Sequence, residues 1–145
     1  MDRVSLGRIE TLHPLYRTLF FEFYIDIVDN VKIDGYWRVV QGYRTFAEQD
    51  ELYAQGRTKS GIIVTNAKGG QSLHNYGLAV DIMGILSNKK LINPTNEVVK
   101  ISKKYSLEWG GEWRTKDMPH FQIKGYKWQD LIHKHLTIDG KYPEL

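Results

Sequence analysis

The chain has 145 residues, a length that suits one domain with its own hydrophobic core. Hydrophobic residues make up 41% and charged residues 26%, which excludes a disordered chain, and the absence of cysteine excludes disulfides and thiolate metal sites. The net charge of +3 suggests only mild attraction to polyanions, and no run of Lys and Arg is interleaved with aromatic residues as a nucleic-acid platform requires. We therefore expect one domain over residues 1–145 with no nucleic-acid partner, in which any metal is bound by histidines and carboxylates.

The N-terminal segment and the most hydrophobic segment both argue against export and membrane insertion. Residues 1–16 contain no apolar core of the kind found in secretory signals. Residues 19–28 are apolar but too few to span a bilayer, and they include Glu22 and Asp26. We expect no signal peptide and no membrane insertion.

Hydrophobic spacing in the first third of the chain predicts a helix, a strand and a second helix. His13 is placed to cap a helix that begins at Pro14, and apolar residues recur at helical spacing as far as residue 27. Residues 37–43 are rich in β-branched and aromatic types, which is typical of a strand. The T-x-x-E pattern at the start of residues 45–54 is a capping box that opens the next helix.

The remainder of the chain predicts a long loop followed by alternating strands and helices. Residues 56–72 are Gly-rich and unpatterned, and a loop of that length in a compact domain is usually functional or disordered. Strands are expected at 78–85 and 120–123, and helices at 93–105 and from residue 128 onward. Because this order lacks regular βαβ alternation, it favours an α+β fold, with a small antiparallel sheet flanked by helices.

Two histidines and one aspartate are candidates for a metal site. His74 ends the Gly-rich loop, Asp81 lies in the strand after it, and His120 begins the strand at 120–123. If the two strands are neighbours, the three side chains can converge from separate rigid elements, as a preorganised site requires. Taken alone, each is more often a satisfied polar group than a ligand. The other three histidines are expected at the surface or in a helix cap: His13, His133 and His135.

Several further motifs resemble one enzyme family. Residues 72–81 read S-x-H-x-x-G-x-A-x-D, residues 117–121 read D-x-P-H-F, and Arg44 follows "QGY" at the end of a strand. Together with "GYRTFAEQDELYAQGRT" and "WGGEWRTKDMPHF", these resemble the zinc D-Ala-D-Ala peptidases, whose superfamily also includes lysostaphin-type peptidases and the hedgehog signalling domain. Within that superfamily the motifs are most similar to the L-alanyl-D-glutamate peptidases, and the match runs from about residue 41 to 121.

The resemblance implies a fold and a set of roles. The fold is expected to be hedgehog/D-Ala-D-Ala peptidase-like, with one Zn²⁺ per chain bound by His74, Asp81 and His120. Asp117 is implied as the general base, which takes a proton from water and returns it to the leaving amine. Arg44 is implied as a fixed positive charge at the developing oxyanion. Substrate contacts are expected from three further residues: Ser72, Trp109 and Trp113.

Some of these assignments have alternatives. Asp117 stands where the vancomycin-resistance-type dipeptidases have glutamate, which favours the L-alanyl-D-glutamate branch. Glu112 is the rival base. Arg44 could instead pair with Glu48 or Asp50, and both tryptophans could fill the core beside the sheet.

The resemblance implies a zinc peptidase that cuts the L-alanyl-D-glutamate bond in the stem peptides of peptidoglycan. We expect a monomeric phage endolysin that stays in the host bacterial cytoplasm until a holin opens the membrane, and then acts on the cell wall. Two alternatives stay open: a D,D-carboxypeptidase or D-Ala-D-Ala dipeptidase on the same scaffold, and a non-catalytic zinc-stabilised binding module. A structural ion needs neither a base nor an oxyanion partner, so the presence of both Asp117 and Arg44 argues against the binding module.

Overall fold

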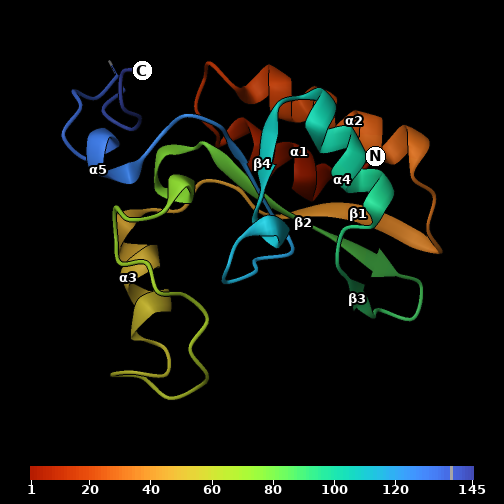
Figure 1. The fold of residues 1–145 in the computed structure, drawn as a ribbon, viewed down its shortest axis with the longest axis horizontal. Coiled ribbons are helices and arrows are strands. Elements are labelled where there is room, and N and C mark those ends of the chain that lie inside the picture. Colours follow the sequence, from red (N-terminus) through yellow and green to blue (C-terminus); the bar gives the residue numbers. More distant parts are fainter. Residues whose placement is uncertain (138) are drawn as a thin grey trace.

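The computed structural model describes residues 1–137 and 139–145 and has an α+β architecture, as predicted (Figure 1). The helices are α1 (Arg3–Glu10), α2 (Arg17–Asn30), α3 (Phe46–Ala54), α4 (Asn96–Lys104) and α5 (Trp128–Leu131), with short 3-10 helices η1 (Leu73–Tyr76) and η2 (Gly110–Glu112). The strands are β1 (Gly35–Gln41), β2 (Ala79–Leu86), β3 (Leu91–Ile92), β4 (Leu107–Trp109) and β5 (His120–Ile123).

The five strands form one antiparallel sheet around β2. Strand β1 pairs along one edge of β2. The other edge of β2 is shared, because β5 pairs with its first residues and β3 with residues 84–85. Strand β4 completes the sheet beyond β5. The two strands predicted to carry Asp81 and His120 are therefore neighbours, and these two residues are directly paired.

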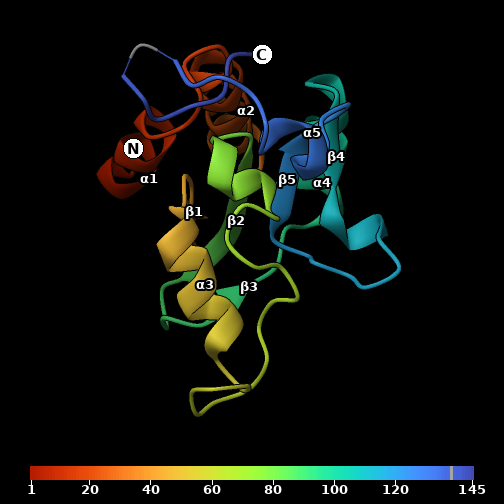
Figure 2. The ribbon, with the colours of Figure 1, turned by 90° about the vertical axis from the view of Figure 1, so that its left-hand side faces the viewer.

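The two faces of the sheet have different surroundings. Helices α1, α2 and α4 cover one face, whereas α3 lies on the other side, below the sheet in Figure 1, as the rotated view in Figure 2 also shows. Alternate strand residues point to opposite faces. The residues that point toward the helices are apolar and buried: Trp37, Val39, Val80, Ile82, Phe121 and Ile123. The intervening positions of β2 and β5, which include Asp81, His120 and Gln122, therefore face away from the core helices.

The expected strands and most of the helices are present, with corrected ends. Helix α2 begins at Arg17 rather than Pro14, because residues 14–16 form a turn. His13 is 2% exposed and its Nε2 lies 2.8 Å from the Pro143 carbonyl oxygen, so it is buried and not at the surface. Its Nδ1 accepts from the Leu15 N–H at 3.2 Å, so His13 does cap the chain here, although it caps the turn before α2 rather than a helix that begins at Pro14. The predictions did not include α1, β3 and β4.

The predicted C-terminal helix is short. Helix α5 ends at Leu131, and both His133 and His135 lie beyond it, exposed as expected. Within residues 1–137 and 139–145, no helix combines the length and apolar character needed to cross a bilayer.

Candidate metal centre

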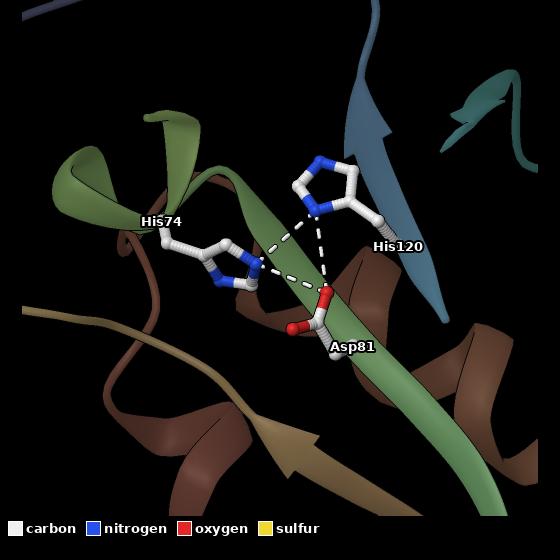
Figure 3. Close-up of side chains that lie close together, drawn as sticks. All are labelled: His74, Asp81 and His120. Carbon is white, nitrogen blue, oxygen red and sulfur yellow. Dashed lines mark hydrogen bonds and ion pairs between the residues drawn. The ribbon is translucent and has the colours of Figure 1, made fainter. Parts of the chain in front are cut away.

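The three predicted ligands come together from three separate elements, as Figure 3 shows. His74 lies in η1, Asp81 in β2 and His120 at the start of β5. Both histidines are buried, at 3% and 4% exposure. Among the residues described, these three form a group of His and carboxylate side chains that could hold a metal ion.

The distances within this triad suit a tetrahedral ion. Nε2 of His74 lies 3.1 Å from Oδ1 of Asp81 and 3.1 Å from Nδ1 of His120, and that Nδ1 lies 3.2 Å from Oδ1 of Asp81. Ligands about 2.0–2.1 Å from zinc at tetrahedral angles are about 3.3 Å apart. The triangle is therefore close to the size that zinc requires.

The outer hydrogen bonds of both imidazoles leave lone pairs at the centre of the triad. Nδ1 of His74 lies 2.8 Å from the carbonyl oxygen of Gly42, and a carbonyl only accepts, so this nitrogen carries the proton. Nε2 of His120 lies 2.8 Å from Oε1 of Gln122 and donates to it in the same way. When both rings are neutral, their inner nitrogens and the Asp81 carboxylate thus present electron pairs to one point, which is the donor set of a cation site.

The electrostatics of the triad agree with a site for positive charge. Burial alone would raise the pKa of Asp81, yet the neighbouring His74 and His120 hold it well below its usual range. Burial alone would lower the pKa of His120, but the hydrogen bond and charge of Asp81 raise it overall. A cation between these groups removes the repulsion among their lone pairs.

The local sequence around His74 explains how its ring is positioned. The Ser72 hydroxyl accepts a hydrogen bond from the His74 backbone N–H at 3.2 Å and caps η1, together with Asn75. Gly77 ends η1 in the left-handed conformation, with φ of 70°, and a Cβ there would lie 2.4 Å from the backbone nitrogen of His13. The serine and glycine of the S-x-H-x-x-G motif therefore shape the turn that carries the ligand.

The triad lies in the wall of a cavity of about 690 Å³, which Asp117 and Ser72 also line. One Asp117 carboxylate oxygen is 3.8 Å from Nδ1 of His120, and the side chain is 49% exposed. Burial of the remaining part raises the pKa of Asp117. Asp117 therefore lies beside the triad without joining it and can exchange protons with solvent, as a general base requires.

Arg44 lines the same cavity but does not form the ion pairs considered as alternatives. Its Nη1 donates to Oε1 of Gln49 at 2.8 Å, and its Nε is buried without a hydrogen-bond partner. Within the described part of the chain, Arg44 has no ion pair with Glu48 or Asp50. Burial lowers the pKa of Arg44, but a guanidinium stays charged in proteins, so Arg44 supplies positive charge at the cavity wall.

The two tryptophans have different surroundings. Trp113 lines the cavity, and its ring centroid lies 5.0 Å from that of His120. Trp109 is not part of the cavity lining; its indole N–H donates to the Met118 carbonyl at 2.7 Å, and its ring packs under Gly111. Both tryptophans were expected to contact substrate. The structure places only Trp113 at the cavity, whereas Trp109 lies under the 110–118 loop.

Glu112, the rival base, points to another partner. Its carboxylate pairs with the Lys103 ammonium, its side chain is 57% exposed, and it does not line the cavity. Asp117 is the carboxylate that lies beside the triad.

Three residues that support the site were not identified from the sequence: Gln122, Glu108 and Gln49. Gln122 and Glu108 lie behind His120, and Gln49 holds Arg44. Gly110 allows the loop to approach the ligand, because a Cβ there would lie 2.5 Å from the Asp117 carbonyl oxygen and 3.2 Å from Cβ of His120. The sequence could have indicated only Gln122, because it lies two residues after His120 in a predicted strand and residues two apart in a strand share a face.

Three comparisons with known proteins found similar sequences and a similar fold. Residues 65–123 match a family model described as D-alanyl-D-alanine carboxypeptidase. The chain is 47% identical over 98 residues to the peptidoglycan L-alanyl-D-glutamate endopeptidase CwlK of Bacillus subtilis (strain 168), a match that covers 59% of this chain and 59% of that protein. The crystal structure of the Serratia marcescens L-Ala D-Glu endopeptidase ChiX superposes with a TM-score of 0.56 at 22% identity, over 86% of this chain and 89% of that one. The resemblance seen in the sequence is thus confirmed: over 98 residues the chain is similar to an L-alanyl-D-glutamate endopeptidase, and it shares the fold of ChiX.

Proposed function

We propose that this protein is a zinc-dependent endopeptidase that hydrolyses the L-alanyl-D-glutamate bond of peptidoglycan stem peptides. The observation that carries the proposal is the convergence of His74, Asp81 and His120, with ligand atoms 3.1–3.2 Å apart, in a cavity that also contains Asp117 and Arg44. The choice of bond is supported by the names of the relatives described above, the proteins CwlK and ChiX.

Each residue has a role that its surroundings support. His74, Asp81 and His120 would hold one zinc ion, which when bound supplies a Lewis acid and water acidic enough to react near neutral pH. Asp117 takes a proton from the attacking water at its carboxylate and returns it to the leaving amine. Arg44 directs its guanidinium toward the carbonyl oxygen of the substrate, where negative charge grows. Trp113 and Ser72 line the cavity and would contact the stem peptide there.

A second candidate is D,D-carboxypeptidase activity on the same scaffold. The observation that favours it is the description of the matching family model, which names D-alanyl-D-alanine carboxypeptidase. A non-catalytic zinc module is less well supported, because a structural ion would need neither a proton acceptor nor a buried guanidinium at the cavity.

Mass spectrometry of digested peptidoglycan separates these candidates. Zinc-loaded protein should release fragments with new N-terminal D-glutamate, leave glycan strands uncut and leave D-Ala-D-Ala intact. Released D-alanine would support the carboxypeptidase instead, and no cleavage with a full zinc complement would support the binding module. A chelator-treated sample is the control, because its activity should return on adding zinc.

We also propose that the protein acts as a monomeric phage endolysin in host lysis, released from the bacterial cytoplasm by a holin. The support is the motif resemblance alone. The test is expression in a bacterial host with and without a holin. Lysis that requires both proteins is expected, and unchanged growth with both would exclude the lytic role.

A further inference from the structure

The outer nitrogen of His120 is hydrogen-bonded to Gln122 of the same strand, and Gln122 is hydrogen-bonded in turn to Glu108 of the neighbouring strand β4. Gln122 is two residues from His120 in β5, so both side chains share the sheet face that carries the triad. Glu108 in β4 is paired directly with Gln122. Oε1 of Gln122 accepts the Nε2 proton of His120 at 2.8 Å, and Nε2 of Gln122 donates to Oε2 of Glu108 at 3.1 Å.

This chain of hydrogen bonds has a direction that Glu108 sets. A carboxylate can only accept, so the Gln122 amide must turn its NH₂ group toward Glu108 and its oxygen toward His120. That oxygen favours the proton of His120 on Nε2 and leaves Nδ1 as a lone pair facing His74 and Asp81. Asp81 favours the other tautomer of His120, because its Oδ1 lies 3.2 Å from Nδ1 of His120 and would accept a proton from that nitrogen.

The same Glu108 oxygen also holds the aromatic wall of the cavity. Oε2 of Glu108 accepts the indole N–H of Trp113 at 2.9 Å. The Trp113 ring lies beside His120 and lines the cavity. One carboxylate oxygen thus connects a candidate metal ligand and a residue on the substrate side.

We propose that Glu108 and Gln122 are positioning residues: Gln122 makes Nδ1 of His120 available as the ligand atom, and Glu108 orients both Gln122 and Trp113. This inference rests on the metal site of the proposed function. Its main claim, that the neutral His120 ring carries its proton on Nε2, also applies to the metal-free protein. Partners of this kind behind a ligating histidine typically change metal affinity by about 10–100-fold.

Three variants separate the roles of the two residues. Gln122→Leu removes the acceptor of His120 alone, whereas Glu108→Leu frees the Gln122 amide to rotate and also releases Trp113. Glu108→Gln keeps an amide oxygen that can accept from both Gln122 and Trp113, so it should rescue what Glu108→Leu loses. Glu22→Leu, an exposed glutamate on α2, is the control for the same change in charge and size.

Nitrogen-15 NMR of the metal-free protein, at alkaline pH where imidazoles are neutral, reads the tautomer of His120 directly. The wild-type protein, Glu108→Gln and Glu22→Leu should have the proton mainly on Nε2, and the two Leu variants should shift it toward Nδ1. The dissociation constant for zinc, measured by chelator competition, should rise about 10–100-fold in the Leu variants and by less than about threefold in Glu108→Gln.

Kinetics with a stem peptide then divide the two Leu variants. Both should lose turnover at limiting zinc. At saturating zinc, Glu108→Leu should raise KM more than Gln122→Leu, because Gln122 and Trp113 both line the cavity and only Glu108→Leu releases both of them. An unchanged His120 tautomer and zinc affinity in Glu108→Leu would overturn the proposal, even if Gln122→Leu did not fold. A wild-type protein that binds zinc but cuts no stem peptide would instead contradict the proposed function and leave the NMR test valid.

Discussion

The cavity wall formed by η1, β2 and β5 is buried and hydrogen-bonded, whereas the opposite rim, formed by residues 55–72 and 113–118, is largely exposed. On the first wall, His74 and His120 are 3% and 4% exposed, and each has its outer nitrogen bonded to an acceptor. On the rim, Asp117 is 49% exposed. The side chains at the tip of the 55–72 loop are exposed by 52–78% and consist of Ile62, Ile63 and Val64.

Hydrogen bonds hold the 55–72 loop both internally, where Arg57 donates to the Thr65 carbonyl at 3.0 Å, and at its end next to η1. Gln49 donates to the Ala67 carbonyl at 2.9 Å, Asp50 accepts from Gly69 N–H at 2.7 Å, and Asn75 accepts from Gly70 N–H at 3.0 Å. The ligand wall is therefore buried and preorganised, whereas the rim is exposed to solvent and to a substrate that enters the cavity. Substitutions in the wall should change metal binding and stability, and substitutions at the rim should change turnover with the fold intact.

Loss of a ligand on the buried wall should have the largest effect. His74→Ala, Asp81→Ala and His120→Ala should each reduce murein hydrolysis to background and lower both zinc content and melting temperature, because metal binding couples three elements. Metal analysis and calorimetry check this. His133→Ala, which removes an exposed histidine, should keep its zinc; full zinc in all three ligand variants would remove the assignment.

Asp117→Asn tests the rim with the fold and metal unchanged. Asparagine has nearly the same shape but cannot take a proton, so kcat should fall about 10²–10⁴-fold while zinc content stays at the wild-type level. Glu112→Gln, at the rival carboxylate, should be much less affected. If Asp117→Asn instead lost zinc, Asp117 would be a ligand; if it kept its activity, Asp117 would be only a turn residue.

Arg44→Lys should have an intermediate effect. Lysine keeps the charge but loses the planar fork that bonds Gln49 and faces the cavity. We expect a decrease in kcat of about 10²-fold, as for a single oxyanion donor, with normal zinc content. Arg3→Lys on the exposed face of α1 is the matched control. Equal kinetics in the two variants would assign Arg44 a purely structural role.

Gly110→Ala should disturb the point where the rim meets the ligand wall. The added methyl group would lie 2.5 Å from the Asp117 carbonyl oxygen and must displace the loop, at a cost of about 1–3 kcal/mol in unfolding free energy. Urea unfolding measures this. Gly7→Ala has open space around its Cβ in α1, so it should be neutral or stabilising by up to about 1 kcal/mol. Equal stability of the two variants would show that the loop yields without cost.

A pH effect remote from the cavity should be the smallest. The Arg38 guanidinium bonds Asp2 at 2.9 Å and holds the pKa of Asp2 at about 2, below its ordinary 3.8. Because the folded-state pKa is the lower one, the pair stabilises the fold above about pH 4, and this contribution is lost as the pH falls toward 2. Asp2→Asn should be less stable than the wild type at pH 6, with the difference vanishing near pH 2 in urea unfolding. A constant difference across this range would exclude the ion pair as its cause.

Local sequence by itself determined the elements that carry the candidate site. The apolar, buried-looking run at residues 78–85 and the short segment 120–123 were both predicted as strands. The capping box at Thr45 predicted the start of α3, where the Thr45 hydroxyl accepts from Glu48 N–H at 3.0 Å. These signals are local, since they depend on the spacing of neighbouring residues. The resemblance of the motifs to a known family likewise implied His74, Asp81 and His120 as ligands, and the structure brings these three together, although a metal at this site stays a prediction.

Only the tertiary structure decided which polar groups stand behind the ligands. Glu108 is hydrogen-bonded to Gln122, the partner of His120, because β4 pairs with β5, and no local sequence pattern predicts that these strands pair. His13 caps the turn after it, as one of the two expectations held, but it is buried because its Nε2 meets the distant Pro143 carbonyl. The conformation of residues 103–118 also gave Trp109 and Trp113 different hydrogen-bond partners and paired Glu112 with Lys103, although these contacts span only 5 to 9 residues. Spacing along the chain specifies which residues can share a face, whereas the register between strands specifies which of them meet.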